Sequence, residues 1–347
     1  MGEQKKNADR ITERLSNTPE DIARAARILR IGGTVAFPTE TVYGLGANAL
    51  DTTAVAGIFA AKERPSWDPI IVHVSDRAML DQVATVSPHA ERLIAAFWPG
   101  PLTLLLPRTE GVPDSVTAGR PLVGVRMPAH PIALALIEAA GVPIAAPSAN
   151  RFGRTSPTTA AHVLEDLDHR IDAILDGGPT TVGVESTVLG LNPDPAQPPV
   201  LYRPGAITAA MLEPITGPVT HHQPPKQPAA EPQSLPSPGV GIRHYAPHAT
   251  LILVKTESEL NNRITQLLGE KEKIGVMLPH NWTIHHRHVK TYQWNSFDDN
   301  EALAQTLFAG LRELDSHGVT VILCPLPGGE GLGLAIRDRL EKAARTK

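Results

Sequence analysis

The chain has 347 residues, of which 41% are hydrophobic and 20% are charged, and its formal net charge at pH 7 is −4. This composition is typical of a globular protein long enough for two domains, and the slightly acidic balance gives no electrostatic reason to expect strong binding to nucleic acid or to a membrane. The polar N-terminus lacks the apolar core of a secretory signal, and no apolar run reaches the roughly 18 residues of a membrane span. The single cysteine, Cys324, cannot form an internal disulfide. We therefore expect a cytoplasmic protein without membrane contact.

Residues 18–212 alternate short apolar runs with helical patterns, which is typical of an α/β domain. Residues 1–17 precede this domain as a polar arm. Thr18 and Pro19 are suited to the N-cap and first position of a helix, and acidic residues follow, so a helix should run to about residue 30. The other predicted elements are strands at 34–37, 70–74, 102–106, 122–126, 142–146, 173–175 and 186–191, and helices at 52–61, 87–97, 131–140 and 158–167.

The composition changes at residue 213, because eight prolines and few large apolar residues occupy 214–238. Such a segment predicts a semi-extended linker over 213–248 rather than part of a core. Its last part, 237–248, regains Arg243, His244 and Tyr245 and is expected to act as a lid. Residues 249–347 form a second, small α/β domain of doubly wound type, with strands at 250–254, 274–278 and 319–324 and helices at 257–268, 298–313 and 332–344.

Polar side chains gather where the predicted strands of the first domain end. Thr39, Thr41 and Tyr43 follow the strand at 34–37, and Lys62 and Arg64 come at the end of the helix at 52–61. Because open α/β sheets bind ligands outside strand ends, two cations beside several hydroxyls favour a pocket for an anionic ligand. The simpler interpretation is a solvated helix end, where the cations complement the helix dipole and an exposed Arg64 contributes little to stability.

Other polar groups allow the same two interpretations. His73 lies in an apolar strand, where a histidine most often belongs to the core, and Ser148, Asn150 and Ser156 suit simple turns. Five polar clusters at strand ends within one domain nevertheless favour a ligand site.

Several glycine and histidine motifs are weaker evidence for a ligand or metal site. The glycines at 44 and 46 let backbone approach a ligand closely, but their G-x-G-x-x-A pattern lacks the strand-to-helix context of a dinucleotide site. The sequence has no P-loop motif. The glycine-rich segment 328–333 is expected to be a turn, and the histidines within 285–288 lack metal-ligand spacing and suit a surface loop.

An ordered set of motifs resembles a known family. PTETVYGLG at 38–46, KERPxxxPxxVHV at 62–74, APSAN at 146–150 followed by SPT, GVESTV at 183–188 and YRPG at 202–205 resemble the YrdC-like domain of threonylcarbamoyl-AMP synthases. SPGxxxRHYAPHA at 237–249 and GLGLAIRDRL at 331–340 resemble the linker and second domain of the two-domain members. The resemblance covers nearly all of 18–344. It implies a twisted, open mixed sheet with helices, followed by a small Rossmann-like α/β domain.

The resemblance also implies a reaction. It is that of a nucleotidyltransferase that joins L-threonine, bicarbonate or CO2, and ATP, and releases pyrophosphate. The threonylcarbamoyl-adenylate then serves the modification of a tRNA adenosine beside the anticodon. The implied cofactor is Mg2+, held through the ATP phosphates without dedicated protein ligands. The implied partner is a downstream tRNA threonylcarbamoyl transferase machinery, with at most a weak contact to tRNA itself.

Site residues follow from the resemblance motif by motif. The residues implied for L-threonine are Thr39, Thr41, Tyr43, His73, Arg126, Ala146 and Ser186. The residues implied for ATP are Lys62, Arg64, Asp68, Ser148, Asn150, Ser156, Arg203 and Tyr245. Lys62 and Arg64 are also the expected catalytic residues, because they would neutralise phosphate charge.

Two positions depart from the commonest family pattern. Glu63 stands where glycine is frequent, and Asp68 stands where asparagine is frequent. Asp68 would repel a triphosphate unless a metal or Arg64 intervenes. Two other functions stay open at this point. One is a carbamoyl-adenylate-forming maturation enzyme, whose paired-cysteine zinc motifs this chain lacks. The other is a double-stranded RNA-binding module, which the near-neutral charge disfavours.

Overall fold

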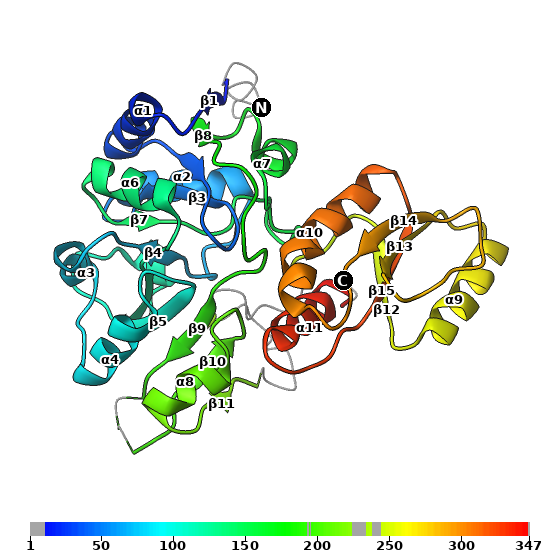
Figure 1. Ribbon diagram of the computed structural model, residues 1–347. Coiled ribbons are helices and arrows are strands. Elements are labelled where there is room, and N and C mark those ends of the chain that lie inside the picture. The colour runs from blue at the N-terminus through cyan, green and yellow to red at the C-terminus, as the bar shows by residue number, and fades with distance from the viewer. Residues whose placement is uncertain (1–10, 193, 195, 224–233, 238–243, 346–347) are drawn as a thin grey trace. The chain divides into compact units, whose positions relative to one another are not determined.

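The structure is a computed structural model that describes residues 11–192, 194, 196–223, 234–237 and 244–345. Its contacts divide the chain into two compact units, and each contains one sheet (Figure 1). The first unit comprises Met1–Phe152, Pro157–Thr181 and Glu185–Gly241, and the second comprises Gly153–Ser156, Val182–Val184 and Ile242–Lys347. None of the helices in the described ranges is long and apolar enough to cross a membrane.

An eleven-stranded sheet forms the first unit, with the strand order β1-β8-β2-β3-β7-β4-β6-β5-β9-β10-β11. Its strands are β1 (Glu13–Leu15), β2 (Val35–Phe37), β3 (Gly44–Asn48), β4 (Ile71–His73), β5 (Leu102–Pro107), β6 (Leu122–Arg126), β7 (Ile144–Ala145), β8 (Ala173–Leu175), β9 (Thr187–Gly190), β10 (Val200–Arg203) and β11 (Thr220–His221). β4 and β6 are parallel, whereas β7 runs antiparallel to β4 and β5 antiparallel to β6. The predicted mixed α/β sheet is confirmed.

Eight helices lie in the described part of the first unit. They are α1 (Pro19–Arg30), α2 (Thr52–Lys62), α3 (Arg77–Val83), α4 (Pro88–Phe97), α5 (Asp114–Thr117), α6 (Pro131–Ala140), α7 (Ala160–Leu167) and α8 (Ala209–Thr216). The predicted start of α1 is confirmed, because the Thr18 hydroxyl accepts a hydrogen bond from the backbone N–H of Asp21 at 3.3 Å. α1 and α6 pack against each other.

Gly44 and Gly46 lie inside β3 rather than in a loop. A Cβ on Gly46 would lie 2.8 Å from side-chain carbons of both Ile144 and Phe37, closer than real Cβ atoms come. The glycine therefore leaves room for two large neighbours to meet across the strand. These residues serve packing within the sheet, not the close ligand approach expected from the sequence.

Three short elements lie where the sequence indicated an arm or a linker. β1 pairs in parallel with β8, and β11 pairs in parallel with β10. β1 (ERL) and β11 (TH) contain polar residues and lack the apolar run that marked the equally short β8 (AIL) in the sequence. α8 contains Pro214, which in a sequence indicates a helix break rather than a helix.

The second unit contains a four-stranded parallel sheet with the order β12-β15-β13-β14. Its elements are β12 (Thr250–Val254), α9 (Glu257–Gly269), β13 (Ile274–Pro279), β14 (Lys290–Trp294), α10 (Asn300–Ser316), β15 (Val321–Pro325) and α11 (Leu332–Ala343). β15 lies between β12 and β13, so the chain crosses the sheet in both directions. The predicted doubly wound α/β domain is confirmed, with β14 as an additional strand.

Two short segments from the middle of the chain belong to the second unit by their contacts. The carbonyl of Gly153 accepts a hydrogen bond from the backbone N–H of Ala246 at 2.9 Å, and the guanidinium of Arg312 on α10 donates to the carbonyl of Thr155. Gly183 has φ 82°, and a Cβ there would lie 2.3 Å from the carbonyl oxygen of Ala304, also on α10. α10 therefore contacts both segments.

Candidate active site

Four of the polar side chains lie at the same end of four neighbouring strands in the interior of the first sheet. His73 and Arg126 are register partners at the ends of the parallel strands β4 and β6. Thr103 is on β5, one residue before Leu104, which pairs with Val125 of β6. Ser186 comes directly before β9, which runs parallel to β5. The register therefore brings together residues that are far apart in the sequence.

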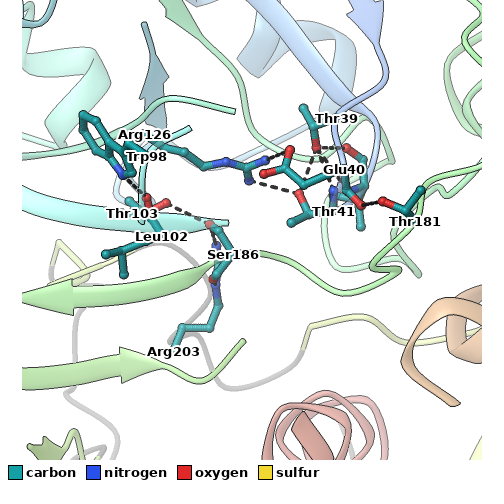
Figure 2. Close-up of polar contacts among 11 residues, drawn as sticks. Thr39, Glu40, Thr41, Trp98, Leu102, Thr103, Arg126, Thr181, Ser186 and Arg203 are labelled. Atoms are coloured by element: carbon teal, nitrogen blue, oxygen red, sulfur yellow. Dashed lines mark hydrogen bonds and ion pairs between the residues drawn. The ribbon is translucent and has the colours of Figure 1, made fainter. Parts of the chain in front are cut away.

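Arg126 is held by the turn that follows β2. Its Nη1 donates to the Thr41 hydroxyl at 3.0 Å, and its Nη2 lies 2.6 Å from Glu40 Oε2 (Figure 2). The hydroxyl of Thr39 lies 2.8 Å from that of Thr41 and donates to the carbonyl of Val42 at 2.7 Å. The predicted threonine-side residues Thr39, Thr41 and Arg126 thus form one connected network, and the network includes Glu40.

This network is closed to solvent. Glu40 is 7% exposed and Arg126 is 3% exposed. Burial, and then the positive charge of Arg126, lower the pKa of His73 to about 3, so its imidazole is neutral at physiological pH. His73 also lies edge to face on Phe37, with ring centroids 6.2 Å apart. The site therefore presents a guanidinium, a carboxylate, hydroxyls and a neutral imidazole.

A second network surrounds Ser186. Its hydroxyl lies 2.8 Å from that of Thr103, while Arg203 donates through Nη2 to Ser186 Oγ at 3.1 Å and through Nε to the Ser186 carbonyl at 2.9 Å. Beside it, the indole N–H of Trp98 donates to the carbonyl of Leu102 at 2.7 Å (Figure 2). Ser186 and Arg203, placed apart in the sequence prediction, are direct partners in the structure.

Lys62 lies at the end of α2 and is 1% exposed. Its ammonium donates to the carbonyl of Ser148 at 2.6 Å and to that of Asn150. Burial lowers the pKa of Lys62. Three predicted ATP-side residues therefore lie together, and the lysine holds the backbone that carries the other two.

Arg64 is also buried rather than exposed at a helix end. Its guanidinium lies 3.0 Å from Asp68 Oδ2 and donates to the carbonyl of Pro69 at 2.7 Å. The side chains of this pair are 5% and 0% exposed. The expectation of a solvated arginine is wrong, because the chain turns back after α2 and places Asp68 against it. Arg64 is the counter-ion that the sequence analysis required for Asp68.

Glu63 explains why glycine is frequent at its position. It ends α2 with φ 54°, in the left-handed region that glycine adopts without strain. Its carboxylate pairs with Arg151 and with Arg170, the latter at 2.9 Å. Hydrogen bonds from Arg151 and then from Arg170 lower the pKa of Glu63.

Two threonine-side residues have other roles in the structure. The hydroxyl of the buried Tyr43 donates to the carbonyl of Gly178 at 2.7 Å, and burial raises its pKa. Ala146 is 5% exposed, and its N–H donates to the Ile71 carbonyl at 2.9 Å. Both residues hold the backbone around the site.

Ser156 and Tyr245 lie in the second unit. The Tyr245 ring stacks on Phe308 with centroids 5.9 Å apart, and the Arg339 guanidinium lies 5.4 Å from its centroid. The Tyr245 carbonyl accepts from the hydroxyl of Thr155, the neighbour of Ser156, at 3.4 Å. The cluster around Tyr245 therefore includes Thr155, the residue before Ser156. Residues 238–243 of the expected lid, Arg243 included, lie outside the described residues.

Glu40 and Thr103 belong to these two networks, although the sequence analysis did not assign them. Glu40 was visible as the carboxylate inside PTETVYGLG, but nothing in the sequence indicated its partner. Thr103 lies in an apolar run, and only the β5–β6 register places it beside Arg126. Within the described ranges, no three His, Cys, Asp or Glu side chains are grouped to hold a metal ion.

Comparison with known proteins adds to this geometry. Residues 27–205 match the family described as "Telomere recombination", and residues 207–345 match the family described as "Threonylcarbamoyl-AMP synthase, C-terminal domain". The sequence is 44% identical over 326 residues to the threonylcarbamoyl-AMP synthase of Pyrococcus abyssi, covering 92% of this chain and 93% of the relative. It is also 44% identical over 340 residues to that of Bacillus subtilis, covering 96% of both.

A solved structure agrees with the sequence comparison. The crystal structure of P. abyssi Sua5 complexed with L-threonine superposes with a TM-score of 0.87 at 42% identity, covering 96% of this chain and 97% of that chain. The similarity therefore extends over both units.

Proposed function

Because the chain belongs to the threonylcarbamoyl-AMP synthase family, nucleotidyltransferases that perform the first step of threonylcarbamoyl-adenosine modification of tRNA, we propose how its site divides between L-threonine and ATP. Threonine binds where the strands β4 and β6 end, beside the turn 39–42. The observation that carries this assignment is the buried Arg126, whose guanidinium is suited to an α-carboxylate. The neutral His73 and the hydroxyls of Thr39, Thr41 and Ser186 offer hydrogen bonds to the rest of the amino acid.

ATP binds beside the Lys62–Arg64 segment and the backbone of 148–150. Lys62 donates to the Ser148 and Asn150 carbonyls of that backbone, Arg64 follows Lys62 by two residues, and Arg203 adds a third charge next to Ser186. Both cations hold carbonyl groups in this structure, so binding of phosphate would draw their N–H groups away from these carbonyls. Arg64 shields the triphosphate from Asp68 by pairing with that carboxylate.

Mg2+ enters as part of the nucleotide substrate. Asp68 is the only acid among the residues proposed for ATP, and its side chain is fully buried against Arg64. With no further carboxylate among these residues, they fit a metal ion that is bound by the ATP phosphates, and this ion would neutralise the phosphate charge.

The chemical step consists of positioning and charge neutralisation. The neutral amine of threonine forms a bond to the carbon of CO2 and releases a proton, or to the carbon of bicarbonate with loss of water, to give a carbamate. A carbamate oxygen then bonds to the α-phosphorus of ATP, and the bond from that phosphorus to the pyrophosphate oxygen breaks. The cations stabilise the charge on the departing pyrophosphate, and no protein nucleophile is required.

The segment around Tyr245 closes over the nucleotide in this proposal. Its support is the hydrogen bond that the Thr155 hydroxyl, next to Ser156, donates to the Tyr245 carbonyl at 3.4 Å. An aromatic ring there would exclude water and protect the mixed anhydride from hydrolysis.

The partner of the protein is a downstream transferase that consumes the adenylate. The location is cytoplasmic, in keeping with the single, buried Cys324.

The test is pyrophosphate release by the full chain in the presence of ATP, Mg2+, bicarbonate and L-threonine. We expect release to require both threonine and bicarbonate. Release without threonine would refute the assignment of the ends of β4 and β6 to this amino acid.

A further inference from the structure

The buried ion pair between Glu40 and Arg126 is incompletely satisfied. Arg126 Nη2 lies 2.6 Å from Glu40 Oε2, but Glu40 Oε1 and Arg126 Nε have no hydrogen-bond partner among the described residues. Buried polar atoms are almost always paired, because an unpaired one forfeits its hydration. One acceptor and one donor are therefore left over in the same pair.

The two unpartnered atoms match the two ends of an α-amino acid. A carboxylate accepts hydrogen bonds and suits Arg126 Nε, whereas an ammonium group donates and suits Glu40 Oε1. A ligand with only a carboxylate would satisfy the arginine and place a second negative charge beside Glu40. A zwitterion satisfies both atoms and keeps the charge balanced.

The surroundings leave Glu40 Oε1 for this role. The other oxygen is taken by Arg126, and the backbone carbonyl of Glu40 accepts from the Thr181 hydroxyl at 3.4 Å (Figure 2). Thr39 and Thr41 bond to each other and to Val42 and Arg126. Because both unpartnered atoms are shielded from solvent, the turn 39–42 has to shift for an amino acid to reach them.

We propose that Glu40 is the residue that binds the amino group of the substrate. This proposal rests on the assignment of L-threonine to the Arg126 site. Glu40 holds the ammonium nitrogen, which must lose a proton before it bonds to the carbon of bicarbonate or CO2, while Arg126 holds the carboxylate at the other end. Together they would select α-amino acids against α-hydroxy acids of the same shape.

The experiment compares two ligands on two proteins. Binding of L-threonine and of the 2-hydroxy acid that carries a hydroxyl in place of its amine is measured by titration calorimetry on the unaltered chain and on Glu40→Gln. We expect the unaltered chain to prefer threonine roughly tenfold or more, as for loss of a charged hydrogen bond. Glu40→Gln should lose most of this preference by weakening threonine alone.

Binding of the hydroxy acid shows whether Glu40 recognises the amino group of the ligand or only holds Arg126 in place. If Glu40 only holds Arg126 in place, Glu40→Gln weakens both ligands by the same factor, and the proposal is overturned. Equal binding of the two ligands by the unaltered chain overturns it without any variant. Failure of the unaltered chain to bind threonine at all would instead refute the site assignment on which the proposal rests.

A second carboxylate serves as the control. Asp172 Oδ2 accepts a hydrogen bond from the backbone N–H of Thr34 at 2.7 Å and has no place in the proposed site. Asp172→Asn should lower the unfolding temperature while leaving the threonine preference unchanged. If it removed the preference as Glu40→Gln does, the preference would reflect general loosening of the fold, and the proposal would fail.

Discussion

Arg64 and Asp68 form a buried ion pair four residues apart, and an exposed counterpart of the same spacing exists at Arg77 and Asp81. The two pairs have similar lengths, 3.0 and 2.8 Å, but side-chain exposures of 5% and 0% against 54% and 56%. Removing one partner of a buried pair leaves an uncompensated charge in a medium that solvates it poorly. The same change at the surface leaves a charge in water.

We therefore expect Arg64→Ala to lower the free energy of unfolding by about 3–5 kcal/mol and to abolish pyrophosphate release. Arg77→Ala removes exposed pairs to Asp81 and Glu91, and it should destabilise the protein far less than Arg64→Ala and leave activity unchanged. Urea denaturation and the pyrophosphate assay measure the two effects. Equal stabilities of the two variants would contradict the burial of Arg64, and normal activity of folded Arg64→Ala would contradict its role at the phosphates.

His73 makes stability depend on pH in a definite direction. Its pKa is about 3 in the folded protein and near 6.5 when unfolded, so below pH 6.5 the unfolded chain gains a proton that the folded chain excludes. The neutral His73→Gln variant lacks this effect. The stability advantage of the unaltered chain over the variant should therefore shrink by about 2 kcal/mol between pH 7 and pH 5. Denaturant titrations at both pH values test this, and a constant difference would show that His73 is not buried.

For single residues, the sequence indicated which side chains lie near the site better than it indicated which side chains contact one another. Thr41, His73 and Arg126 were singled out by motif, and the structure brings them together. Glu40 stood in the same motif without an assignment, because a carboxylate's role depends on which cation lies opposite. Arg64 was interpreted as exposed for the same reason, since its burial depends on the turn that returns Asp68 to it.

Among the elements, helices with caps and long apolar strands were predictable from local chemistry. α1 begins at its predicted cap, and β6 and α6 have their predicted bounds. β3 was missed, because its two glycines suggest a loop until the side chains of Phe37 and Ile144 are seen beside Gly46. The short strands β1 and β11 were also missed, because their residues are partly polar and only sheet pairing defines them.

The loop before β9 depends on α10 through Gly183. A side chain there meets two obstacles, a φ of 82° and the Ala304 carbonyl oxygen 2.3 Å from its Cβ. Gly141, at the end of α6, has φ 67° but nothing within 4 Å of its Cβ position. Gly141→Ala isolates the backbone cost of about 1–2 kcal/mol.

We expect Gly183→Ala to destabilise the protein clearly more than Gly141→Ala, and also to lower pyrophosphate release, because Ser186 follows three residues later. Gly141→Ala should keep full activity. Thermal unfolding and the pyrophosphate assay on both variants test this. Equal losses of stability would mean that α10 does not restrict the loop.

At the scale of the whole molecule, the second unit is not built from the C-terminal part of the chain alone, because it also contains residues 153–156 and 182–184. A chain truncated after Pro236 keeps these segments but loses α10 and the Tyr245 cluster that bond to them. We expect truncation to lower the unfolding temperature, to weaken ATP binding and to shorten the lifetime of the adenylate. Tyr245→Ala in the full chain should reproduce the last two effects.

ATP titrations and chromatography of the adenylate over time compare the three proteins. If the truncated chain bound ATP and retained the adenylate as the full chain does, Tyr245 would not cover the nucleotide. If Tyr245→Ala alone matched the full chain, the effect of truncation would come from the loss of α10.

The shared segments also have a consequence for synthesis on the ribosome. Residues 153–156 and 182–184 leave the exit tunnel before any of α10 has been translated, although the unit to which they belong is completed only near the end of the chain. Domains generally fold in order from the N-terminus as they emerge. Here the first sheet can form early, but residues 153–156 and 182–184 gain their packing partners only after the last helices have been translated. A nascent chain would therefore carry the first fold while these two short segments still lack the helix against which they pack.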